Sequence, residues 1–367
     1  MKKIIILGAG RQGLTAGEFL RNKKTNVTFI DINEENLKAA KKAGFKAAKR
    51  VMKTKDDIAK TIRGYDLAIS ALPARLGRMA HLGAITAKTN MVDVSYSEDD
   101  PLELQRMCEK NNVILIPDAG IAPGTSNLMA GRLYRSFDKA ETIKIYVGGM
   151  PEKNLPPLGY SITWSPEDLI SEYERKAKIR KNFKSLTVEP LTGIENMQFK
   201  GFETLQAFYT DGLRTLSKTL KNVKNLEEKT MRYAGHVDKI KFLFEMGYFE
   251  QTAGNTKPRE TSLELMKRIK YKNLRDVLLM RVIGEGVVKG RKKRIEYEII
   301  DFADKNHSAM ERTTGYSLAA FSFWLLNNPQ SRGGVLTPEE IGMDEKNFKE
   351  IIRLLSEKKI KTSMRII

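Results

Sequence analysis

The amino-acid sequence predicts an α/β protein with a doubly wound parallel sheet followed by a second domain of α+β type. From residue 3 to about 120, short β-branched runs alternate with longer helical patterns, which is typical of parallel strands joined by crossover helices. A glycine-rich turn stands between the first run and the first helical pattern. Past Pro117, strand patterns follow one another without a helix after each, which favours a mixed or antiparallel sheet.

The first domain is predicted to contain six strands with helices between them. The strands are Lys3–Leu7, Val27–Asp31, a short one near Phe45–Ala47, Leu67–Ser70, Met91–Val94 and Val113–Ile116. The helices are Gln12–Asn22, Glu34–Ala43, Asp56–Ile62, Arg75–Ala87 and Pro101–Lys110. In a sheet of this kind, ligands bind at the carboxyl ends of the strands.

The second domain is predicted to contain five strands and three helices. The strands are Ile143–Val147, Leu186–Glu189, Lys200–Ala207, Val282–Lys289 and Lys293–Asp301, and the helices are Pro166–Ile179, Val237–Met246 and Ser262–Lys270. A long apolar helix, Tyr316–Leu326, is expected to return to the first domain, and Pro338–Ile367 is expected to form at most a pair of short surface helices. We therefore assign residues 1–121 and 308–367 to the first domain and residues 122–307 to the second.

Composition excludes several classes of protein. With 41% hydrophobic and 30% charged residues among 367, the chain is neither disordered nor collagen-like. Its single cysteine, Cys108, cannot form an intramolecular disulfide, and its three histidines form no zinc-ligand pattern, so we expect no metal. The apolar run after Lys3 stops at Gly8, too short for a signal peptide, and no run reaches the roughly 18 residues of a membrane span. We expect a cytoplasmic protein.

The formal net charge is +19, and basic residues cluster at 175–184 and 289–294. One interpretation is a nucleic-acid-binding or regulatory protein that retains a dinucleotide fold, and a steeply salt-dependent affinity for DNA without turnover would support it. The interpretation that we favour is a Lys- and Glu-rich surface of the kind found in heat-stable proteins. It predicts a thermophilic protein with neither a nucleic-acid nor a membrane partner.

The glycine-rich turn has the spacing of a dinucleotide-binding site of the Rossmann type. Gly8 permits the tight turn, Gly10 lets the backbone approach a pyrophosphate, and Gly13 allows close packing of helix on strand. Asp31 stands 23 residues after Gly8, where an acid accepts hydrogen bonds from ribose hydroxyls and repels a 2′-phosphate. We therefore predict NAD as the cofactor, with Arg11 and Asn33 as the residues that would compensate for a 2′-phosphate.

Three further loops fall at predicted strand ends and should border the same ligand. Ala71-Leu72-Pro73 is expected near the nicotinamide ribose, and the loops that end the fifth and sixth strands should bring Tyr96 and Asp118 towards the reacting ring. Ordinary turn chemistry explains the same residue types equally well. The cofactor-binding residues predicted in full are Gly8, Gly10, Arg11, Gln12, Gly13, Asp31, Ile32, Ala71, Leu72, Pro73 and Ser95.

Taken together, these loops resemble the saccharopine dehydrogenase-like family, and further segments point to its lysine 6-dehydrogenase branch. The most specific segments are Ile116–Gly131, Val147–Tyr173, Ala207–Leu216, Lys229–His236 and Glu311–Ala320. The resemblance implies a Rossmann domain interrupted by a domain for substrate binding and dimerisation. It implies oxidation or reduction, with NAD or NADP, at a carbon that bears an amino nitrogen, and a homodimer or larger homo-oligomer.

In the lysine branch, the resemblance implies oxidation of the ε-amine carbon to an imine. The imine hydrolyses to the 6-semialdehyde with loss of ammonia, and the semialdehyde cyclises to piperideine-6-carboxylate. Hydride leaves only from a carbon whose nitrogen has a free lone pair, so the site must remove a proton from an ammonium group. It must also hold the α-carboxylate with a cation and the α-ammonium with hydrogen-bond acceptors.

These roles select candidate residues for the substrate site. Asp118 is the first candidate for binding or deprotonating the amine, and His236 is the second. Arg232 and Arg312 are candidates for the carboxylate, with Tyr96, Thr163, Tyr209 and Asp211 as polar lining. A structural or surface role is the competing interpretation for each of them. A saccharopine-type or carboxynorspermidine-type enzyme is the alternative function, distinguished by the number of cationic side chains in the pocket.

Overall fold

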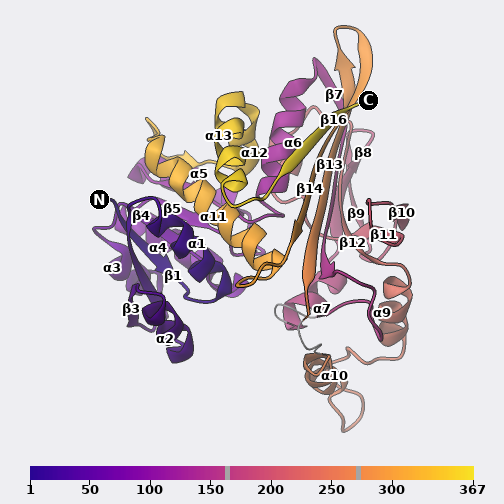
Figure 1. Cartoon of the computed structure of the whole chain (residues 1–367), viewed down its shortest axis with the longest axis horizontal. Coiled ribbons are helices and arrows are strands. Elements are labelled where there is room, and N and C mark those ends of the chain that lie inside the picture. The colour runs from indigo at the N-terminus through magenta and orange to yellow at the C-terminus, as the bar shows by residue number, and fades with distance from the viewer. Residues whose placement is uncertain (162–165, 270–273) are drawn as a thin grey trace. The chain divides into compact units, whose positions relative to one another are not determined.

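The computed structural model describes residues 1–161, 166–269 and 274–367 and forms two compact units (Figure 1). Unit 1 comprises Met1–Ser136, Arg214–Leu220 and Glu311–Thr362, and unit 2 comprises Phe137–Leu213, Lys221–Met310 and Ser363–Ile367. The domain division expected at residues 121 and 308 stays a prediction. One short segment, Arg214–Leu220, belongs to unit 1 although the chain on both sides of it belongs to unit 2.

Unit 1 is built on a seven-stranded parallel sheet of order β15-β6-β5-β4-β1-β2-β3. Its strands are β1 (Lys3–Leu7), β2 (Asn26–Asp31), β3 (Lys46–Lys49), β4 (Leu67–Ser70), β5 (Met91–Asp93), β6 (Ile114–Ile116) and β15 (Gly334–Val335). The order reverses between β1 and β4, which defines a doubly wound sheet with a ligand-binding crevice at that point. The predicted fold class is confirmed, and the seventh strand, β15, is a two-residue strand that sequence patterns cannot resolve.

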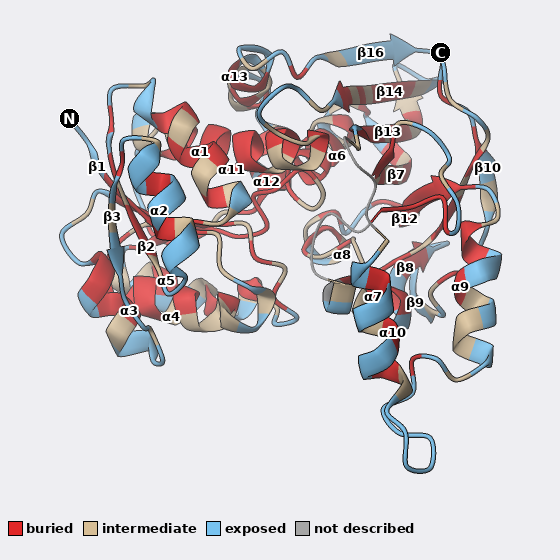
Figure 2. Ribbon diagram, turned by 60° about the horizontal axis from the view of Figure 1, so that its bottom comes forward, coloured by how far each residue is buried: buried red, intermediate tan, exposed pale blue. Residues whose placement is uncertain are grey.

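Helices cover both faces of this sheet, as the burial pattern in Figure 2 shows. The described helices of this unit are α1 (Arg11–Arg21), α2 (Glu34–Lys42), α3 (Lys55–Ile62), α4 (Gly77–Ala87), α5 (Gln105–Asn111), α6 (Thr125–Ser136), α8 (Leu216–Thr219), α11 (Ala309–Asn327), α12 (Pro338–Met343) and α13 (Glu345–Ser356). Short 3-10 turns precede α4 at Ala74–Leu76 and α5 at Pro101–Leu104. The predicted long helix is α11, and it begins at Ala309 rather than Tyr316.

The core between the sheet and α3, α4 and α5 is made of small and branched apolar side chains. Ile5, Leu7 and Ala68 from the strands meet Ile58 and Ala84 from the helices. Capping sets where the neighbouring helices begin: Thr54 and Asp57 form a reciprocal capping box at α3, and Asn33 caps α2. By contrast, no side chain of the described residues caps the first turn of α1, whose N-cap residue is Gly10.

Unit 2 is built on a nine-stranded mixed sheet. Its strands are β7 (Lys139–Pro151), β8 (Ala177–Lys181), β9 (Lys184–Val188), β10 (Glu195–Met197), β11 (Leu205–Tyr209), β12 (Asn225–Tyr233), β13 (Asp276–Val288), β14 (Arg291–Phe302) and β16 (Thr362–Ile366). Strands β7 and β12 are parallel, whereas β7 with β13 and β13 with β14 are long antiparallel pairs. The described helices of this unit are α7 (Pro166–Glu174), α9 (His236–Glu245) and α10 (Pro258–Lys267).

Three sequence predictions for this part of the chain were wrong in detail. The helix predicted over 166–179 ends at Glu174, and β8 begins at Ala177 because Ala177 and Ile179 point into the core while Lys178 between them is exposed. Strand β12 was not predicted, because its buried positions include Glu228, Lys229 and Arg232, which a hydrophobic pattern marks as exposed. The strand predicted at Lys200–Ala207 is β11, shifted towards the C-terminus.

The C-terminal segment is more integrated than predicted. Helix α12 is mostly buried and packs closely on α6, because an added Cβ at Gly342 would stand 2.0 Å from the Leu128 carbonyl oxygen. Helix α13 buries Phe348, Ile351 and Leu354 on one face. The chain then ends in β16, which joins the sheet of unit 2 beside β14. Within the described part of the chain, no helix is both long and apolar enough to cross a membrane.

The contact between α6 and α12 leads to a test of packing. Replacing Gly342 by Ala places a methyl group against backbone, which cannot move away as a flexible side chain can, so we expect a loss of about 1–3 kcal/mol in the free energy of unfolding, measured by chemical denaturation. The control is Lys346→Ala on the exposed face of α13, which should change stability by less than about 0.5 kcal/mol. Equal stability of the two variants would contradict the close packing.

Candidate functional site

The glycine-rich turn of unit 1 has the geometry that its sequence predicts. Gly8 has a φ of +98°, and a Cβ there would stand 2.4 Å from the Ala71 carbonyl oxygen. A Cβ at Gly13 would stand 2.0 Å from the Gly8 carbonyl oxygen. At Gly10, in contrast, no described atom lies within 4 Å of the position of a Cβ. The first and third glycines are therefore required by the fold, whereas the second leaves open space beside the start of α1.

Asp31 ends β2 beside this turn and ties the two together. Its Oδ2 accepts a hydrogen bond from the Ala9 N–H at 2.7 Å and from Asn36 Nδ2 at 3.1 Å, and its Oδ1 accepts one from the Asn33 N–H at 2.8 Å. The next residue, Ile32, is 59% exposed, which leaves an apolar surface directly beside the acid. The carboxylate thus stands at the carboxyl edge of the sheet, at the position that contacts ribose in folds of this type.

These residues fit a dinucleotide. The first N–H groups of α1 lack a side-chain cap, the space at Gly10 is open, and Gln12 Oε1 is buried without a partner among the described residues. Such a helix start binds phosphate groups through its N–H groups and its dipole. When bound, the cofactor would supply a nicotinamide ring for hydride transfer. Arg11 lies beside the turn, and its Nε is 3.2 Å from Glu311 Oε1.

The loops that follow β4 and β5 also lie at this edge of the sheet. Ala71 of the Ala71-Leu72-Pro73 loop donates its N–H to the Leu7 carbonyl oxygen, at 2.8 Å, which brings the loop against the glycine turn. Ser95 follows β5, and its hydroxyl donates to Asp93 Oδ2 at 2.6 Å. The same carboxylate oxygen lies 2.8 Å from His81 Nε2. The hydroxyl of Ser95 therefore orients Asp93, and its predicted contact with the cofactor stays a prediction.

The loop after β6 carries an ion pair that sequence reasoning did not predict. Arg214 contacts both oxygens of Asp118, with Nε 3.0 Å from Oδ2 and Nη2 3.1 Å from Oδ1. The two side chains are 9% and 1% exposed. The guanidinium of Arg214 also lies over the ring of Tyr96, 4.5 Å from its centre. The structure thus brings the predicted pair Tyr96 and Asp118 together through a third residue.

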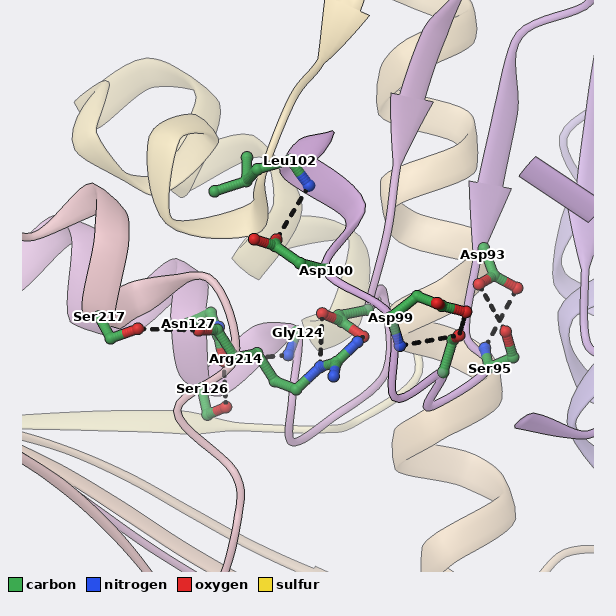
Figure 3. A network of polar contacts seen from close by, with 12 residues as sticks. Asp93, Ser95, Asp99, Asp100, Leu102, Gly124, Ser126, Asn127, Arg214 and Ser217 are labelled. Carbon is green, nitrogen blue, oxygen red and sulfur yellow. Dashed lines mark hydrogen bonds and ion pairs between the residues drawn. The ribbon is translucent and has the colours of Figure 1, made fainter. Parts of the chain in front are cut away.

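Backbone geometry singles out the same pair. Asp118 and Arg214 have φ values of +54° and +49°, in the left-handed region that non-glycine residues adopt rarely and that often marks functional loops. Burial raises the pKa of the Asp118 carboxyl above its usual range, while the charge of Arg214 acts in the opposite direction. Figure 3 shows Arg214 within a wider polar network that includes Gly124, Asn127 and Asp100.

The segment that carries Arg214 is fixed to unit 1 by further polar contacts. The Thr219 hydroxyl donates to Glu339 Oε1 at 2.7 Å, and Glu339, in the first turn of α12, is fully buried. Lys218 pairs with Asp100, whose other carboxylate oxygen accepts the Leu102 N–H at 3.0 Å (Figure 3). These contacts hold α8 in place, so Arg214 meets Asp118 in a defined geometry.

Unit 2 contains a second buried polar cluster, centred on Arg232 of β12. Its guanidinium lies over the ring of Tyr160, 4.4 Å from the ring centre, and its Nη2 is 3.7 Å from Glu172 Oε2 of α7. The side chain is 4% exposed, and its Nε is buried without a hydrogen-bond partner in the described part of the chain. A guanidinium so placed is suited to bind a planar anion, because its donors form a rigid fork.

His236 belongs to this cluster, and both of its ring nitrogens are engaged. Nδ1 is 2.8 Å from the Leu158 carbonyl oxygen, which only accepts, so Nδ1 carries the hydrogen. Nε2 is 3.0 Å from the Tyr173 hydroxyl and accepts from it. Burial lowers the pKa of His236 to about 3, and the charge of Arg232 acts in the same direction. The predicted role of His236 as a base stays a prediction, and these bonds favour Asp118.

Glu228 is the other titratable group of the cluster that sequence reasoning missed. It is 5% exposed, its Oε2 is 2.9 Å from the Thr210 hydroxyl, and a Cβ at Gly212 would stand 2.3 Å from its carboxyl carbon. Burial raises the pKa of Glu228 to about 8, although Thr210 acts in the opposite direction. Asp211 is half-buried and its charge adds to the upward shift.

The remaining predicted residues lie apart from these clusters or outside the described residues. Tyr209 points to the opposite face of the sheet from Arg232, where its hydroxyl donates to Glu227 Oε2 at 3.1 Å. Arg312, in unit 1, donates from Nη2 to the Lys358 carbonyl oxygen at 2.8 Å, just beyond the end of α13. Thr163 lies outside the described residues. Their substrate-binding roles stay predictions.

Among the described residues, no group of three His, Cys, Asp or Glu side chains is placed to hold a metal ion.

Comparison with known protein families assigns the chain to one of them. The model described as the saccharopine dehydrogenase C-terminal domain matches residues 120–360. The chain belongs to the saccharopine dehydrogenase family. The model described as the saccharopine dehydrogenase NADP binding domain matches residues 4–116, the region of the glycine turn and Asp31. Together with the geometry of the turn, this match indicates a nicotinamide cofactor.

Individual relatives agree with this family. The NADP(+), L-glutamate-forming saccharopine dehydrogenase of Saccharomyces cerevisiae is 28% identical over 265 residues, which cover 69% of this chain and 59% of that protein. The mitochondrial alpha-aminoadipic semialdehyde synthase of Rattus norvegicus is 29% identical over 199 residues, 51% of this chain and 21% of that protein. The chain thus spans about three fifths of the first of these relatives and a smaller share of the second.

A solved structure shares the fold. Apo saccharopine dehydrogenase (L-Glu forming) from Saccharomyces cerevisiae aligns over the whole of both chains with a TM-score of 0.82 and 20% identity. At that identity, the likeness establishes the architecture of a doubly wound sheet with a second mixed sheet, and no more.

The residues that sequence reasoning missed share one property, which is that their partners are distant in sequence. Arg214 is 96 residues from Asp118, and Glu172 is 58 residues from Thr230. Arg214 lies inside the segment Ala207–Leu216 that carried the family resemblance. The sequence therefore offered a signal for Arg214, a charged residue within such a segment, but it did not identify Asp118 as the partner.

The environment of Glu228 predicts a pH dependence of stability. Its pKa in the folded protein, about 8, is above the ordinary 4.5, so the protonated form favours folding. This stabilisation is complete below about 4.5 and is lost as the pH rises through 8, with a slope of at most about 1.4 kcal/mol per pH unit. Replacing Glu228 by Gln should remove this fall, measured as the free energy of unfolding between about pH 5 and pH 9. Parallel curves for the two proteins would contradict the assignment.

Proposed function

We propose that this protein is an NAD-dependent dehydrogenase that oxidises the carbon bearing the ε-amine of L-lysine. The products are NADH, a proton and an imine, which hydrolyses to the 6-semialdehyde and ammonia before the semialdehyde cyclises to piperideine-6-carboxylate. Membership of the saccharopine dehydrogenase family supports a dehydrogenase acting at a carbon–nitrogen bond. The glycine turn, the uncapped start of α1 and Asp31 support the dinucleotide.

The observation that carries the proposal is the pair Arg232 and Glu172. A buried guanidinium and a carboxylate 3.7 Å apart present the two charges that complement an amino acid's α-carboxylate and α-ammonium. The partnerless Nε of Arg232, judged over the described residues, supports the binding of one further acceptor there. Tyr160 stacks on the guanidinium and orients it.

The charge of Arg214 favours lysine over a substrate with more carboxylates. Asp118 contacts this guanidinium through both oxygens, so the pair is neutral as a unit. Within its own cluster of described residues, Arg232 is the buried cation offered to a substrate carboxylate, which suits a monocarboxylate. The alternative is a saccharopine-type or carboxynorspermidine-type reaction, favoured by the names of the relatives, three of which are saccharopine dehydrogenases of fungi.

We assign the removal of the amine proton to Asp118. A carboxylate oxygen has two lone-pair sites, so the bonds to Arg214 leave one site on each oxygen for the amine. Burial raises the pKa of this carboxyl, which makes it a stronger base than an exposed aspartate. Arg214 keeps the carboxylate oriented, and the ring of Tyr96 packs against the guanidinium of Arg214. Water then attacks the imine, and ammonia leaves.

The choice of NAD rests on Asp31. A carboxylate at the end of β2 accepts hydrogen bonds from ribose hydroxyls and repels a 2′-phosphate. Arg11, the residue that would compensate, pairs with Glu311. The yeast relative, by its name, uses NADP(+), so the cofactor preference of this chain is a specific point to test. A homodimer, a cytoplasmic location and a heat-stable surface stay predictions.

The function is tested by following NADH formation with the purified protein, NAD and, separately, lysine, saccharopine and ornithine, with ammonia assayed afterwards. We expect lysine-dependent NADH together with ammonia in equal amounts. In the variant Arg232→Gln, KM for lysine should rise by about tenfold or more because a charged hydrogen bond is lost. NADH formation with saccharopine and none with lysine would transfer the function to the alternative.

The cofactor preference is tested by Asp31→Ser. We expect the affinity for NAD to fall by about 10-fold to 100-fold, because charged hydrogen bonds to ribose are lost, whereas the affinity for NADP should change little or rise. Binding of each dinucleotide is measured by fluorescence titration, with Asp56→Ser, in the exposed first turn of α3, as the control. An equal loss for both dinucleotides would remove Asp31 from the ribose role.

A further inference from the structure

Four side chains in unit 2 form an unbroken buried chain of polar contacts. Glu172 Oε1 of α7 is 2.8 Å from the Thr230 hydroxyl of β12, which is 2.8 Å from the Thr210 hydroxyl, which is 2.9 Å from Glu228 Oε2. Thr210, Thr230 and Glu228 are each 5% exposed or less, and the Glu172 side chain is 15% exposed. Two carboxyl groups are thus joined through two hydroxyl groups, at distances normal for O–H···O hydrogen bonds.

The number of protons that these contacts need determines the charge of the four side chains. Each of its three contacts is a hydrogen bond and needs one proton. A threonine hydroxyl has a single proton, so Thr210 and Thr230 together supply two. An ionised carboxylate supplies none. The third proton must therefore come from a carboxyl group, and either Glu172 or Glu228 is protonated.

The surroundings of the two ends decide which carboxyl carries the proton. Glu172 faces the guanidinium of Arg232 at 3.7 Å, which stabilises a negative charge. Glu228 faces Thr210, the backbone of Gly212 and the half-buried Asp211, none of which offers it a positive charge. Burial raises the pKa of Glu228 to about 8, and the charges of Glu172 and Asp211 add to the shift, whereas Arg232 opposes it. The proton therefore resides on Glu228.

We propose that Glu228, Thr210, Thr230 and Glu172 form a proton relay that stores one proton on Glu228 and transfers it to Glu172. In the transfer, the O–H bond of Glu228 breaks as its proton passes to Thr210. Thr210 passes its own proton to Thr230, and Thr230 passes its proton to Glu172 Oε1. One proton leaves one carboxyl and one arrives at the other, both hydroxyls end neutral, and the total charge is unchanged.

The relay adjusts the charge of Glu172 to the charge of the group beside it. This role of the relay rests on the proposed function. While a cation stands beside Glu172, either Arg232 or the α-ammonium of an amino acid, the proton stays on Glu228 and Glu172 is a carboxylate. When a substrate carboxylate takes over Arg232 without an ammonium group beside Glu172, transfer neutralises Glu172 and removes a repulsion between like charges. The relay thus lets the pair Arg232 and Glu172 accept a carboxylate with or without an ammonium group beside it.

The stored proton is tested by infrared spectroscopy of the complete protein without substrate or cofactor. A protonated carboxyl group has a C=O stretch that is separate from those of carboxylates. We expect this band at neutral pH in the wild-type protein, its loss in Glu228→Gln, and its retention in Glu296→Gln. Glu296 is the matched control because it is also 5% exposed but pairs with Arg294 and Arg365. Burial also raises the pKa of Asp118 and Glu339, so the decisive observation is the difference spectrum: identical carboxyl bands in the wild-type protein and Glu228→Gln would overturn the assignment.

The relay itself is tested by coupling between its ends. Gln at position 172 can donate through its amide, which allows the hydroxyls to reverse and Glu228 to ionise. Glu172→Gln should therefore lower the pH at which the Glu228 band disappears by about one unit, tenfold in the proton's equilibrium constant. In Thr230→Val, which interrupts the chain, Glu172→Gln should produce less than half that shift. An undiminished shift would show that the ends interact only through space and would overturn the relay.

Both measurements are independent of the reaction that the protein catalyses. If lysine is not oxidised but the band and its coupling are found, the relay stands and the proposed function fails. If lysine is oxidised but the band is unaffected by Glu228→Gln, the relay fails alone.

Discussion

The ion pair between Arg214 and Asp118 is the interaction on which the candidate site of unit 1 depends. Both charges are buried, and removing one partner of such a pair leaves an uncompensated charge, a loss of about 3–5 kcal/mol. The pair holds two residues in left-handed backbone conformations, and it ties the loop after β6 to a segment that enters unit 1 from the middle of unit 2's sequence. Glu339 and Asp100 secure the same segment through Thr219 and Lys218. Orientation of the Asp118 carboxylate is therefore a property of the whole unit.

The buried charges of unit 2 must also be compensated, but they are compensated in a different way. Its buried cluster contains one guanidinium, Arg232, and two carboxyl groups, Glu172 and Glu228, so full ionisation would leave an excess negative charge in a region of low polarity. The structure resolves this by pairing one carboxylate with Arg232 and linking the other to hydroxyls. The result is a guanidinium and a carboxylate side by side, which is the complement of an amino acid, and a neutral acid behind them.

Each unit carries its own set of polar groups. The glycine turn, Asp31 and the loops at the carboxyl edge of the parallel sheet offer N–H groups and a carboxylate to a dinucleotide. Asp118 adds a buried carboxylate that Arg214 holds in one orientation. In unit 2, Arg232 and Glu172 place a guanidinium and a carboxylate 3.7 Å apart.

The amino-acid sequence alone predicted the β1–α1–β2 unit, the glycine turn with Asp31, and the alternation that makes a doubly wound sheet. These depend on local periodicity and on spacing within a few tens of residues, which a sequence displays directly. It located Asp118, Tyr96, Arg232 and His236 without showing what each contacts. The folded chain alone shows that Arg214 pairs with Asp118, that β12 buries its charged residues, and that Glu172 is connected to Glu228 through two threonines. A hydrophobic pattern predicts that charged residues lie on the surface. A buried charge is stable only when a partner compensates it, and here the partners are distant in sequence. Packing of the whole fold, and not local sequence, therefore determines which charged residues pair.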